Sequence, residues 1–225
     1  MSPNVSNYRM ASGDQGNGRE RYHHGNLREA LIQAALAMIA ERGLAGFAIA
    51  ELARVVGVSP AAPYRHFRDR NAVIAEVARR GFESLAADLT AATISWRTDP
   101  LGALERAAQA HVAFAGREAA VYAAMFDTGF PSGEHPELVQ ARDGAFAVLR
   151  RAAEAACAMS RAPRRPPPLM VALHVWSLTH GIATLFVGQD GNNRLLIPMP
   201  PEALLEAGLL VYLQSLGLPS GNTSE

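Results

Sequence analysis

The sequence predicts an all-α protein with an N-terminal three-helix domain, which contains a helix-turn-helix, joined to a longer C-terminal helical domain. Three observations predict this fold. Apolar residues recur at helical spacing through most of the 225 residues, and no segment alternates with the period of two that marks a half-buried strand. Glycine and proline also separate the helical segments at intervals typical of helices and their turns.

The N-terminal segment is polar. Residues 1–18 are rich in Ser, Asn and Gly and have little to bury, so we expect a disordered tail. Arginines and histidines within 19–24 then form a basic arm, which either reaches DNA or is simply solvated. The first helix is expected to begin at Asn26, with Glu29 completing a capping arrangement, and to end at Gly43.

The stretch from Phe47 to Phe67 predicts two short helices around a tight turn. The first, at about 48–55, places its apolar side chains on one stripe. Gly57 follows where the turn needs a residue that tolerates an unusual backbone angle. Ser59 and Pro60 are residue types of an N-cap and a first helical position, so they are expected to start the second helix.

The second helix of this pair would present two different faces. Pro63 and Phe67 lie four residues apart and should point into the domain. Ala61, Ala62 and Arg65 lie opposite, where small side chains let a helix approach base edges and an arginine can donate two bonds to a guanine. We therefore expect this face to read bases; the alternative is an ordinary helical hairpin packed in a core.

The segment SPAAPYRHF at 59–67, with Arg-Asp-Arg after it, resembles the signature of the TetR family of dimeric bacterial transcriptional repressors. The resemblance covers about 27–82. Two residues depart from the family pattern: Ala48 replaces the usual Ser or Thr cap, and Pro63 replaces the usual leucine. The residues expected to contact DNA, of which Tyr64, His66 and Arg70 would hold phosphates, are Ser59, Pro60, Ala61, Ala62, Tyr64, Arg65, His66 and Arg70.

A fourth helix is expected to start after an Asp69 cap and to run from Arg70 to about Leu89. It would join the N-terminal domain (the head) to the C-terminal domain (the body). Five further helices are expected at about 101–115, 118–127, 137–161, 169–187 and 202–216. The expected segments are thus the tail at 1–18, a helix-turn-helix DNA-binding domain at 19–70, a helical effector-binding and dimerisation domain at 71–217, and a flexible tail at 218–225.

The segment WSLTHG at 176–181, with Met125 and Phe126 upstream, resembles the WHG type of C-terminal domain found in some TetR-like regulators. This resemblance implies an all-α body that dimerises and holds a small-molecule effector. The helices at 169–187 and 202–216 are also apolar over most of their circumference, so they must be buried. We expect these two helices from each subunit to form a four-helix homodimer interface.

An effector pocket is expected among the helices of the body. His111 or His180 would supply a polar group in an apolar cavity. The alternative is a core histidine bonded to a backbone carbonyl, and an aromatic stripe can equally be core. The expected lining residues are Trp96, His111, Phe114, Tyr122, Met125, Phe126, Trp176 and His180.

Charge and hydropathy narrow the function classes. Basic and acidic residues balance at 21 each, which argues against a non-specific polyanion binder. Residues 19–70, however, hold eight arginines against five acidic residues, which suits a protein that touches DNA with one end. No signal peptide is recognisable, and the longest apolar stretch, 170–187, contains His, Ser and Thr. We expect a cytoplasmic protein without a membrane span.

The sequence contains no pattern that indicates a catalytic or metal site. His174 and His180 are six residues apart, on roughly opposite sides of a helix, so they cannot chelate a metal together. Phosphate-loop, nucleophile-elbow and zinc-protease motifs are absent from the sequence. We expect no enzyme, cofactor or metal, but a homodimeric ligand-responsive repressor on a pseudo-palindromic double-stranded DNA operator. The alternative is a small-molecule binding or sequestering dimer whose head no longer recognises an operator.

Overall fold

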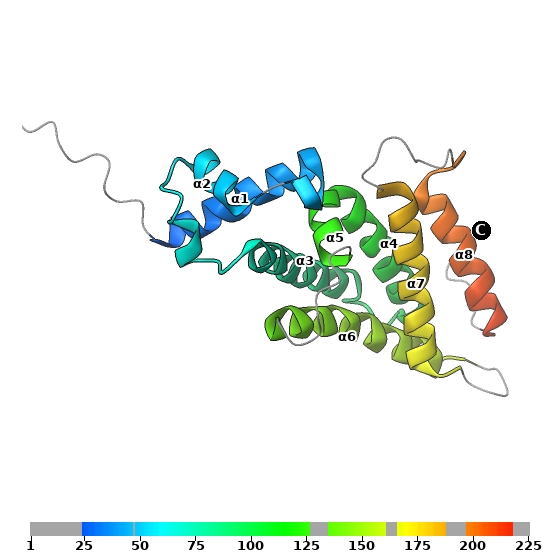
Figure 1. Cartoon of the computed structure of the whole chain (residues 1–225). Coiled ribbons are helices and arrows are strands. Elements are labelled where there is room, and N and C mark those ends of the chain that lie inside the picture. Colours follow the sequence, from blue (N-terminus) through cyan, green and yellow to red (C-terminus); the bar gives the residue numbers. More distant parts are fainter. Residues whose placement is uncertain (1–23, 47, 127–134, 161–165, 188–196, 218–225) are drawn as a thin grey trace, which may run out of the picture.

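The computed structural model describes residues 24–46, 48–126, 135–160, 166–187 and 197–217. Within these ranges the chain is all-α, as predicted, with no strand (Figure 1). The expected tails at 1–18 and 218–225 lie outside the described residues, as do 19–23 of the basic arm. The helices are α1 (His24–Arg42), α2 (Ile49–Val56), α3 (Arg70–Ala92), α4 (Pro100–Arg117), α5 (Ala119–Phe126), α6 (Pro136–Ala158), α7 (Pro168–Val187) and α8 (Pro201–Ser215), with short 3₁₀ helices η1 (Leu44–Gly46) and η2 (Pro63–Arg65).

The N-terminal head packs α1, α2 and η2 against the first turns of α3. Its core contains fully buried Leu31 of α1, Leu52 of α2 and Val73 of α3. Gly43 ends α1 at φ 72° and Gly57 ends α2 at φ 76°, both in the left-handed region that favours glycine. The two glycine stops expected from the sequence are therefore confirmed.

The helix caps of the head differ from one another. The Glu51 carboxylate accepts a hydrogen bond from the Ala48 N–H at 3.0 Å, but the Ala48 methyl cannot return one, so α2 has only half of a reciprocal capping box. Asp69 caps α3 as predicted, accepting from the Ala72 N–H at 2.9 Å. Helix α1 begins at His24, so the predicted start at Asn26 is wrong by two residues.

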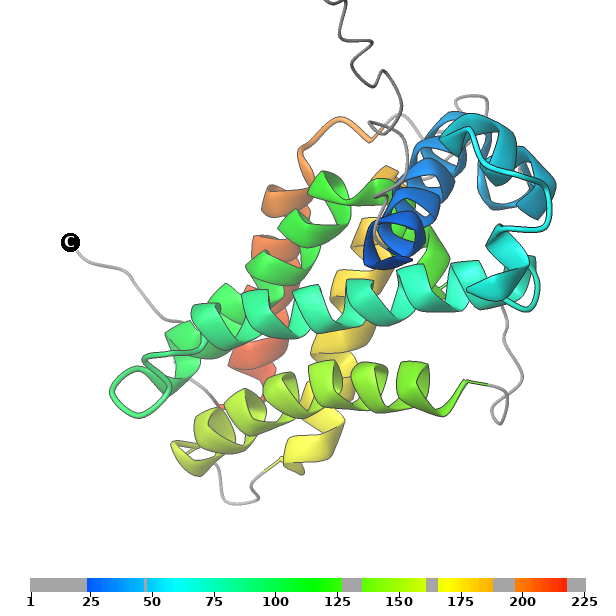
Figure 2. The ribbon, with the colours of Figure 1, turned by 90° about the vertical axis from the view of Figure 1, so that its left-hand side faces the viewer.

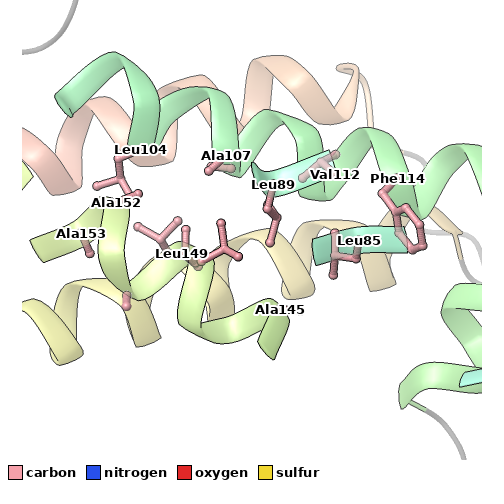
Figure 3. Packing of buried hydrophobic residues seen from close by; sticks show 14 of the residues in the cluster. Leu85, Leu89, Leu104, Ala107, Val112, Phe114, Ala145, Leu149, Ala152 and Ala153 are labelled. Atoms are coloured by element: carbon pink, nitrogen blue, oxygen red, sulfur yellow. The ribbon is translucent and has the colours of Figure 1, made fainter. Parts of the chain in front are cut away.

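The body is built on α3, α4 and α6, which pack along one another (Figure 2). Leu85 and Leu89 of α3, Leu104 of α4 and Leu149 of α6 all belong to this core, and all four are essentially inaccessible to solvent (Figure 3). Many neighbouring positions are alanine, which lets the helix backbones approach closely. The body therefore has one continuous hydrophobic core, to which these leucines belong.

Helices α7 and α8 lie side by side at the end of the molecule opposite α2 (Figure 1). One face of α7 is buried against α4, α6 and α8 through residues such as Val175 and Ile182. The other face is exposed, with Leu173 at 43% and Leu185 at 42%. By length and composition alone α7 could cross a membrane, but a helix of this kind that also packs in a core is weak evidence for a span. Within a single chain, the predicted burial of α7 is therefore confirmed for one of its faces only.

A charged cluster joins the head to the body. The Glu76 carboxylate of α3 is only 9% exposed and accepts hydrogen bonds of 2.8–2.9 Å from Arg28 of α1 and from Arg79 and Arg80. Arg80 also reaches Glu29 of α1 at 2.6 Å. Burial alone would raise the pKa of Glu76, but the bonds from the three arginines outweigh it and hold that pKa well below its usual range. These bonds fix α1 on α3.

We predict that Glu76→Gln lowers the free energy of unfolding by about 2–3 kcal/mol, because three guanidinium groups lose a shared partner. Glu83→Gln, about two turns further along α3, is the control. Glu83 is 55% exposed, and its loss should cost under about 0.5 kcal/mol. Chemical denaturation of both variants measures these losses. Since the pKa of Glu76 is depressed, its contribution is complete above about pH 5 and should be lost progressively as the pH falls further. Equal losses in the two variants would contradict the role of Glu76.

Candidate functional site

The segment between α2 and α3 contains less helix than the sequence predicts. Instead of a helix over 59–67, the chain makes a turn followed by the 3₁₀ helix η2. Pro63 has no N–H to donate to the Ser59 carbonyl, so the Ala62 and Arg65 N–H groups bond three residues back, at 2.9 and 3.2 Å. Only the Phe67 N–H bonds four residues back, to Pro63 at 2.9 Å. The predicted second α-helix is therefore wrong, and its cause is Pro63.

The two expected faces of this segment are nevertheless present. Pro63 is buried and Phe67 is 3% exposed, so both point into the head as predicted. The Arg28 guanidinium lies 5.1 Å from the centroid of the Phe67 ring, which connects this anchor to the Glu76 cluster. On the outer side Tyr64 and Arg65 are exposed. The segment is thus held from within and presents its outer side chains to solvent.

The other residues expected to contact DNA lie on the same short stretch. Ser59, Pro60 and Ala61 are exposed, whereas Ala62 and His66 are half-buried. Arg70 is the first residue of α3 and is half-buried, next to the Asp69 cap. The contacts of all eight residues with DNA stay predictions.

In the body, four polar side chains form one hydrogen-bonded chain. The Thr179 hydroxyl of α7 lies 3.0 Å from Nδ1 of His111 on α4. Nε2 of His111 lies 3.2 Å from the Tyr122 hydroxyl of α5, which in turn lies 2.8 Å from Nδ1 of His180 on α7. We call these four residues the His–Tyr chain. It joins three helices across the body.

The Thr179 hydroxyl also lies 3.0 Å from the Val175 carbonyl and 3.0 Å from the Trp176 carbonyl of its own helix. In each bond of the His–Tyr chain one partner donates and the other accepts, and the tautomers of the two histidine rings set the order.

His111 stays neutral in this chain. It is 1% exposed, and burial, with a smaller effect of nearby His180, lowers its pKa to about 3. A neutral imidazole has one donor and one acceptor nitrogen, which matches the two bonds that His111 makes. His111 therefore bonds two side chains, Thr179 and Tyr122, rather than a backbone carbonyl.

Aromatic rings surround the His–Tyr chain. The Phe126 ring lies 4.4 Å from the His180 ring and 4.7 Å from the Tyr122 ring, between centroids. The Trp176 ring lies 4.7 Å from His111 and 5.7 Å from Phe146 of α6. Phe126, Trp176 and His180 are half-buried. The His–Tyr chain is thus a line of polar groups that is packed among aromatic rings.

Five of the eight expected pocket residues come together here, namely His111, Tyr122, Phe126, Trp176 and His180. The other three do not. Trp96 is 43% exposed and lines a separate groove of about 950 Å³ between α3 and α6. Phe114 is fully buried on α4, and the Arg117 guanidinium lies 5.4 Å from its ring centroid. Met125 faces α3, where a Cβ at Gly81 would come 2.6 Å from its Sδ atom.

Sequence reasoning missed Thr179, Phe82 and Phe146. Thr179 stands beside His180, but its partner His111 is 68 positions away, and no local spacing pairs them. Phe82 packs edge-on against Phe126 at 5.4 Å between centroids. The only sequence signal for Thr179 was its place one turn after Val175, from which a threonine commonly bonds back along a helix.

Cys157 and the possible metal ligands show no further site. Cys157 is 3% exposed, and burial raises the pKa of its thiol, as for a cysteine packed in a core. In the part of the chain that the structure describes, no three His, Cys, Asp or Glu side chains gather closely enough to hold a metal ion.

Two family models match this chain. Residues 31–77 match the model described as bacterial regulatory proteins, tetR family. Residues 104–212 match the model described as tetracyclin repressor-like, C-terminal domain. Together they cover the head and most of the body, which confirms the resemblance read from the sequence. No curated protein matches.

Solved structures share the whole fold. A protein with unknown function from a Rhodococcus species is 30% identical, with a TM-score of 0.72, over 88% of this chain and 99% of that one. The TetR family transcriptional regulator PfmR from Thermus thermophilus is 20% identical, with a TM-score of 0.64, over 82% and 97%. AibR, solved in complex with isovaleryl coenzyme A and operator DNA, is 15% identical, with a TM-score of 0.64, over 82% and 97%.

We predict that Tyr122→Phe destabilises the body by about 1–3 kcal/mol, because the Nε2 atom of buried His111 loses its hydrogen-bond partner. The matched control is Tyr212→Phe: its hydroxyl bonds Nδ1 of His174 at 3.0 Å, but at an exposed site. That loss should stay below about 1 kcal/mol, since water can replace the bond. Denaturant midpoints compare the two variants, and a larger loss for Tyr212→Phe would contradict the His–Tyr chain.

Proposed function

This chain belongs to the TetR family of bacterial regulatory proteins, and from that premise we propose that it is a homodimeric, ligand-responsive repressor acting in the cytoplasm on a pseudo-palindromic operator. The observation that carries this proposal is the outer edge of η2. Tyr64 and Arg65 project into solvent from a segment anchored by buried Pro63 and Phe67. A rigid backbone with exposed polar side chains is what a DNA groove can engage.

Each residue of that edge has a distinct proposed role. Ala61 and Ala62 have small side chains, so the backbone can approach base edges closely. Arg65 donates two bonds to a guanine in the major groove. Tyr64, His66 and Arg70 bond phosphate oxygens and fix the register of the head on the duplex. The η2 segment has less helix than a long recognition helix, so fewer side chains reach the bases.

We predict that Arg65→Ala weakens operator binding by about 1–3 kcal/mol and relaxes the preference for one base, because a bidentate guanine contact is lost. Arg70→Ala is the comparison: a phosphate contact carries no sequence information, so it should weaken all sequences alike and flatten the salt dependence. Gel shifts with fragments upstream of the chain's own gene, repeated at several salt concentrations, measure both effects.

Two results of this experiment would reject parts of the proposal. An equal loss on all sequences for Arg65→Ala would remove its base-reading role. No shift with any fragment at low salt would reject operator binding and favour the alternative function, a small-molecule binding or sequestering dimer. Pro63 is the observation behind that alternative, because it shortens the segment that would enter the groove.

The exposed apolar face of α7 and α8 supports the homodimer. Side chains on this face are large, and a helix face of this kind is normally covered. They are Leu169 at 51%, Met170 at 48%, Leu173 at 43%, Leu185 at 42%, Leu210 at 43% and Val211 at 70% exposure. Gly181 also lies on the exposed side, with nothing near its Cβ position, so a partner helix can approach closely there. Two copies of α7 and α8 would form a four-helix interface.

We predict that Leu173→Glu shifts the protein from dimer to monomer, because a charge would be buried in the interface. Ile94→Glu is the matched control: Ile94 is 85% exposed, in the connection between α3 and α4, away from the proposed interface. Analytical ultracentrifugation should show a dimer for the control and a monomer for Leu173→Glu. If both variants were dimeric, the interface would have to lie elsewhere.

The His–Tyr chain and its aromatic surround are the proposed effector site. Helix α5 would transmit binding, since three of its sides contact different parts of the protein. Tyr122 and Phe126 line the site, and Met125 meets Gly81 of α3. Ala124 is fully buried in the core of the head. A shift of α5 would therefore move both α3 and the head, with a coupling free energy of about 1–3 kcal/mol between effector and operator.

A further inference from the structure

We propose that the groove between α3 and α6 is a second small-molecule site, which takes an elongated organic anion with an apolar body. The groove shares no lining residue with the His–Tyr chain or with the aromatic rings around that chain, so it is separate from the proposed effector site. Three features carry the inference: the small side chains that form the groove, the hydrogen-bond donors that line it, and two arginines beside it that have no ion pair among the described residues.

Alanines occupy both walls of the groove. Ala86, Ala87 and Ala91 line it from α3, and Ala152 and Ala155 line it from α6. The two helices pack along one another (Figure 2), but these short side chains leave a volume of about 950 Å³ beside them. A volume of this size lies within the range of small-molecule sites, and the walls are mainly apolar. The groove can therefore hold the apolar body of a ligand.

The polar groups that line the groove leave donors available rather than acceptors. The Thr90 and Thr93 hydroxyls donate to carbonyls of their own helix, at 2.7 and 2.8 Å. The Glu154 carboxylate already faces a positive charge, since it lies 3.8 Å from Nε of Arg150. The Trp96 side chain offers only an indole N–H, which is a donor. These groups favour a ligand that accepts hydrogen bonds.

Two arginines supply positive charge at the groove. Arg151 of α6 lines it, and its Nε–H donates to the Ala147 carbonyl of the preceding turn at 3.3 Å. The Arg97 guanidinium lies 4.8 Å from the centroid of the Trp96 ring. Among the described residues neither has a carboxylate at ion-pair distance, whereas the other arginines of α4 and α6 each pair with one. A ligand carboxylate would complement these guanidinium groups.

A carboxylate on an alkyl chain matches the groove in both respects. The carboxylate would pair with Arg151, and the chain would cover the alanines, Trp96 and Ile94, which is 85% exposed. Because the Arg151 side chain is exposed, this ion pair is screened by water and salt and is worth at most about fivefold in affinity. Most of the affinity would come from the burial of the chain.

The test uses three probes of one alkyl chain length that differ in charge: octanoate, octanamide and octylammonium. The chain has two tryptophans, so full-length protein with Trp176→Phe reports binding through Trp96 alone. We expect octanoate to bind about three- to fivefold tighter than octanamide, and octylammonium to bind most weakly, because the arginines attract only the anion. This preference should shrink as the salt concentration rises from about 0.05 to about 0.5 M.

Arg151→Gln, in the same background, is the decisive variant. Glutamine keeps a long polar side chain without the charge, so the preference for octanoate should fall below about twofold. Arg142→Gln is the matched control: Arg142 is also an exposed arginine of α6, but it does not line the groove and lies 3.3 Å from Asp143. It should keep the full preference. Ala91→Phe fills the groove from an exposed position of α3, so all three probes should lose their binding.

Several results would overturn the inference. Octanamide or octylammonium binding as tightly as octanoate, or an unchanged preference in Arg151→Gln, rejects the anion. Probes that bind Ala91→Phe as well as the parent protein, or that never change Trp96 emission, reject the groove as their site. If Arg151→Gln changes the oligomeric state, the groove is an interface between copies of the chain. None of these results bears on the proposed function, which depends on the head and on the His–Tyr chain.

Discussion

The carboxylate of Glu76 is the interaction on which the arrangement of head and body depends. Helix α3 belongs to two cores: Val73 and Val77 are buried in the head, whereas Phe82 and Leu85 are buried in the body. Within the head segment of α3, Glu76 binds three arginines, one of them from α1. Hydrophobic packing holds each core together but is not directional, so these charge-assisted bonds fix the orientation of α1 on α3.

Helix α5 gives the head a second connection to the body. With only eight residues, it would not be stable alone, so its position is set by the surfaces that it contacts. The absence of a side chain at Gly81 lets Val121 and Met125 pack directly on the α3 backbone. Because the same helix carries Tyr122 and Phe126, a ligand at the His–Tyr chain would act on an element that is already in contact with the DNA-binding part.

The sequence predicts the helices well because their signals are local. Periodic apolar residues, Gly43, Gly57 and the Asp69 cap all act within one or two turns. The prediction failed at 59–67, where the apolar pattern favoured a helix but the missing N–H of Pro63 decided the geometry. The candidate site was predicted in part, since the aromatic and histidine residues were recognisable. Which of them meet depends on helix packing, so Trp96 was misplaced and Thr179 was missed.

The short η2 segment has a consequence for how a regulator of this kind would find its target in a genome. Fewer side chains at the base edges mean less sequence information from each half-site, and a short half-site recurs by chance many times. Discrimination would then depend on the fixed separation of two half-sites, set by the dimer, and on how readily the intervening DNA bends or twists. The rigidity of the body, rather than the length of the reading segment, would thus decide which promoter is occupied.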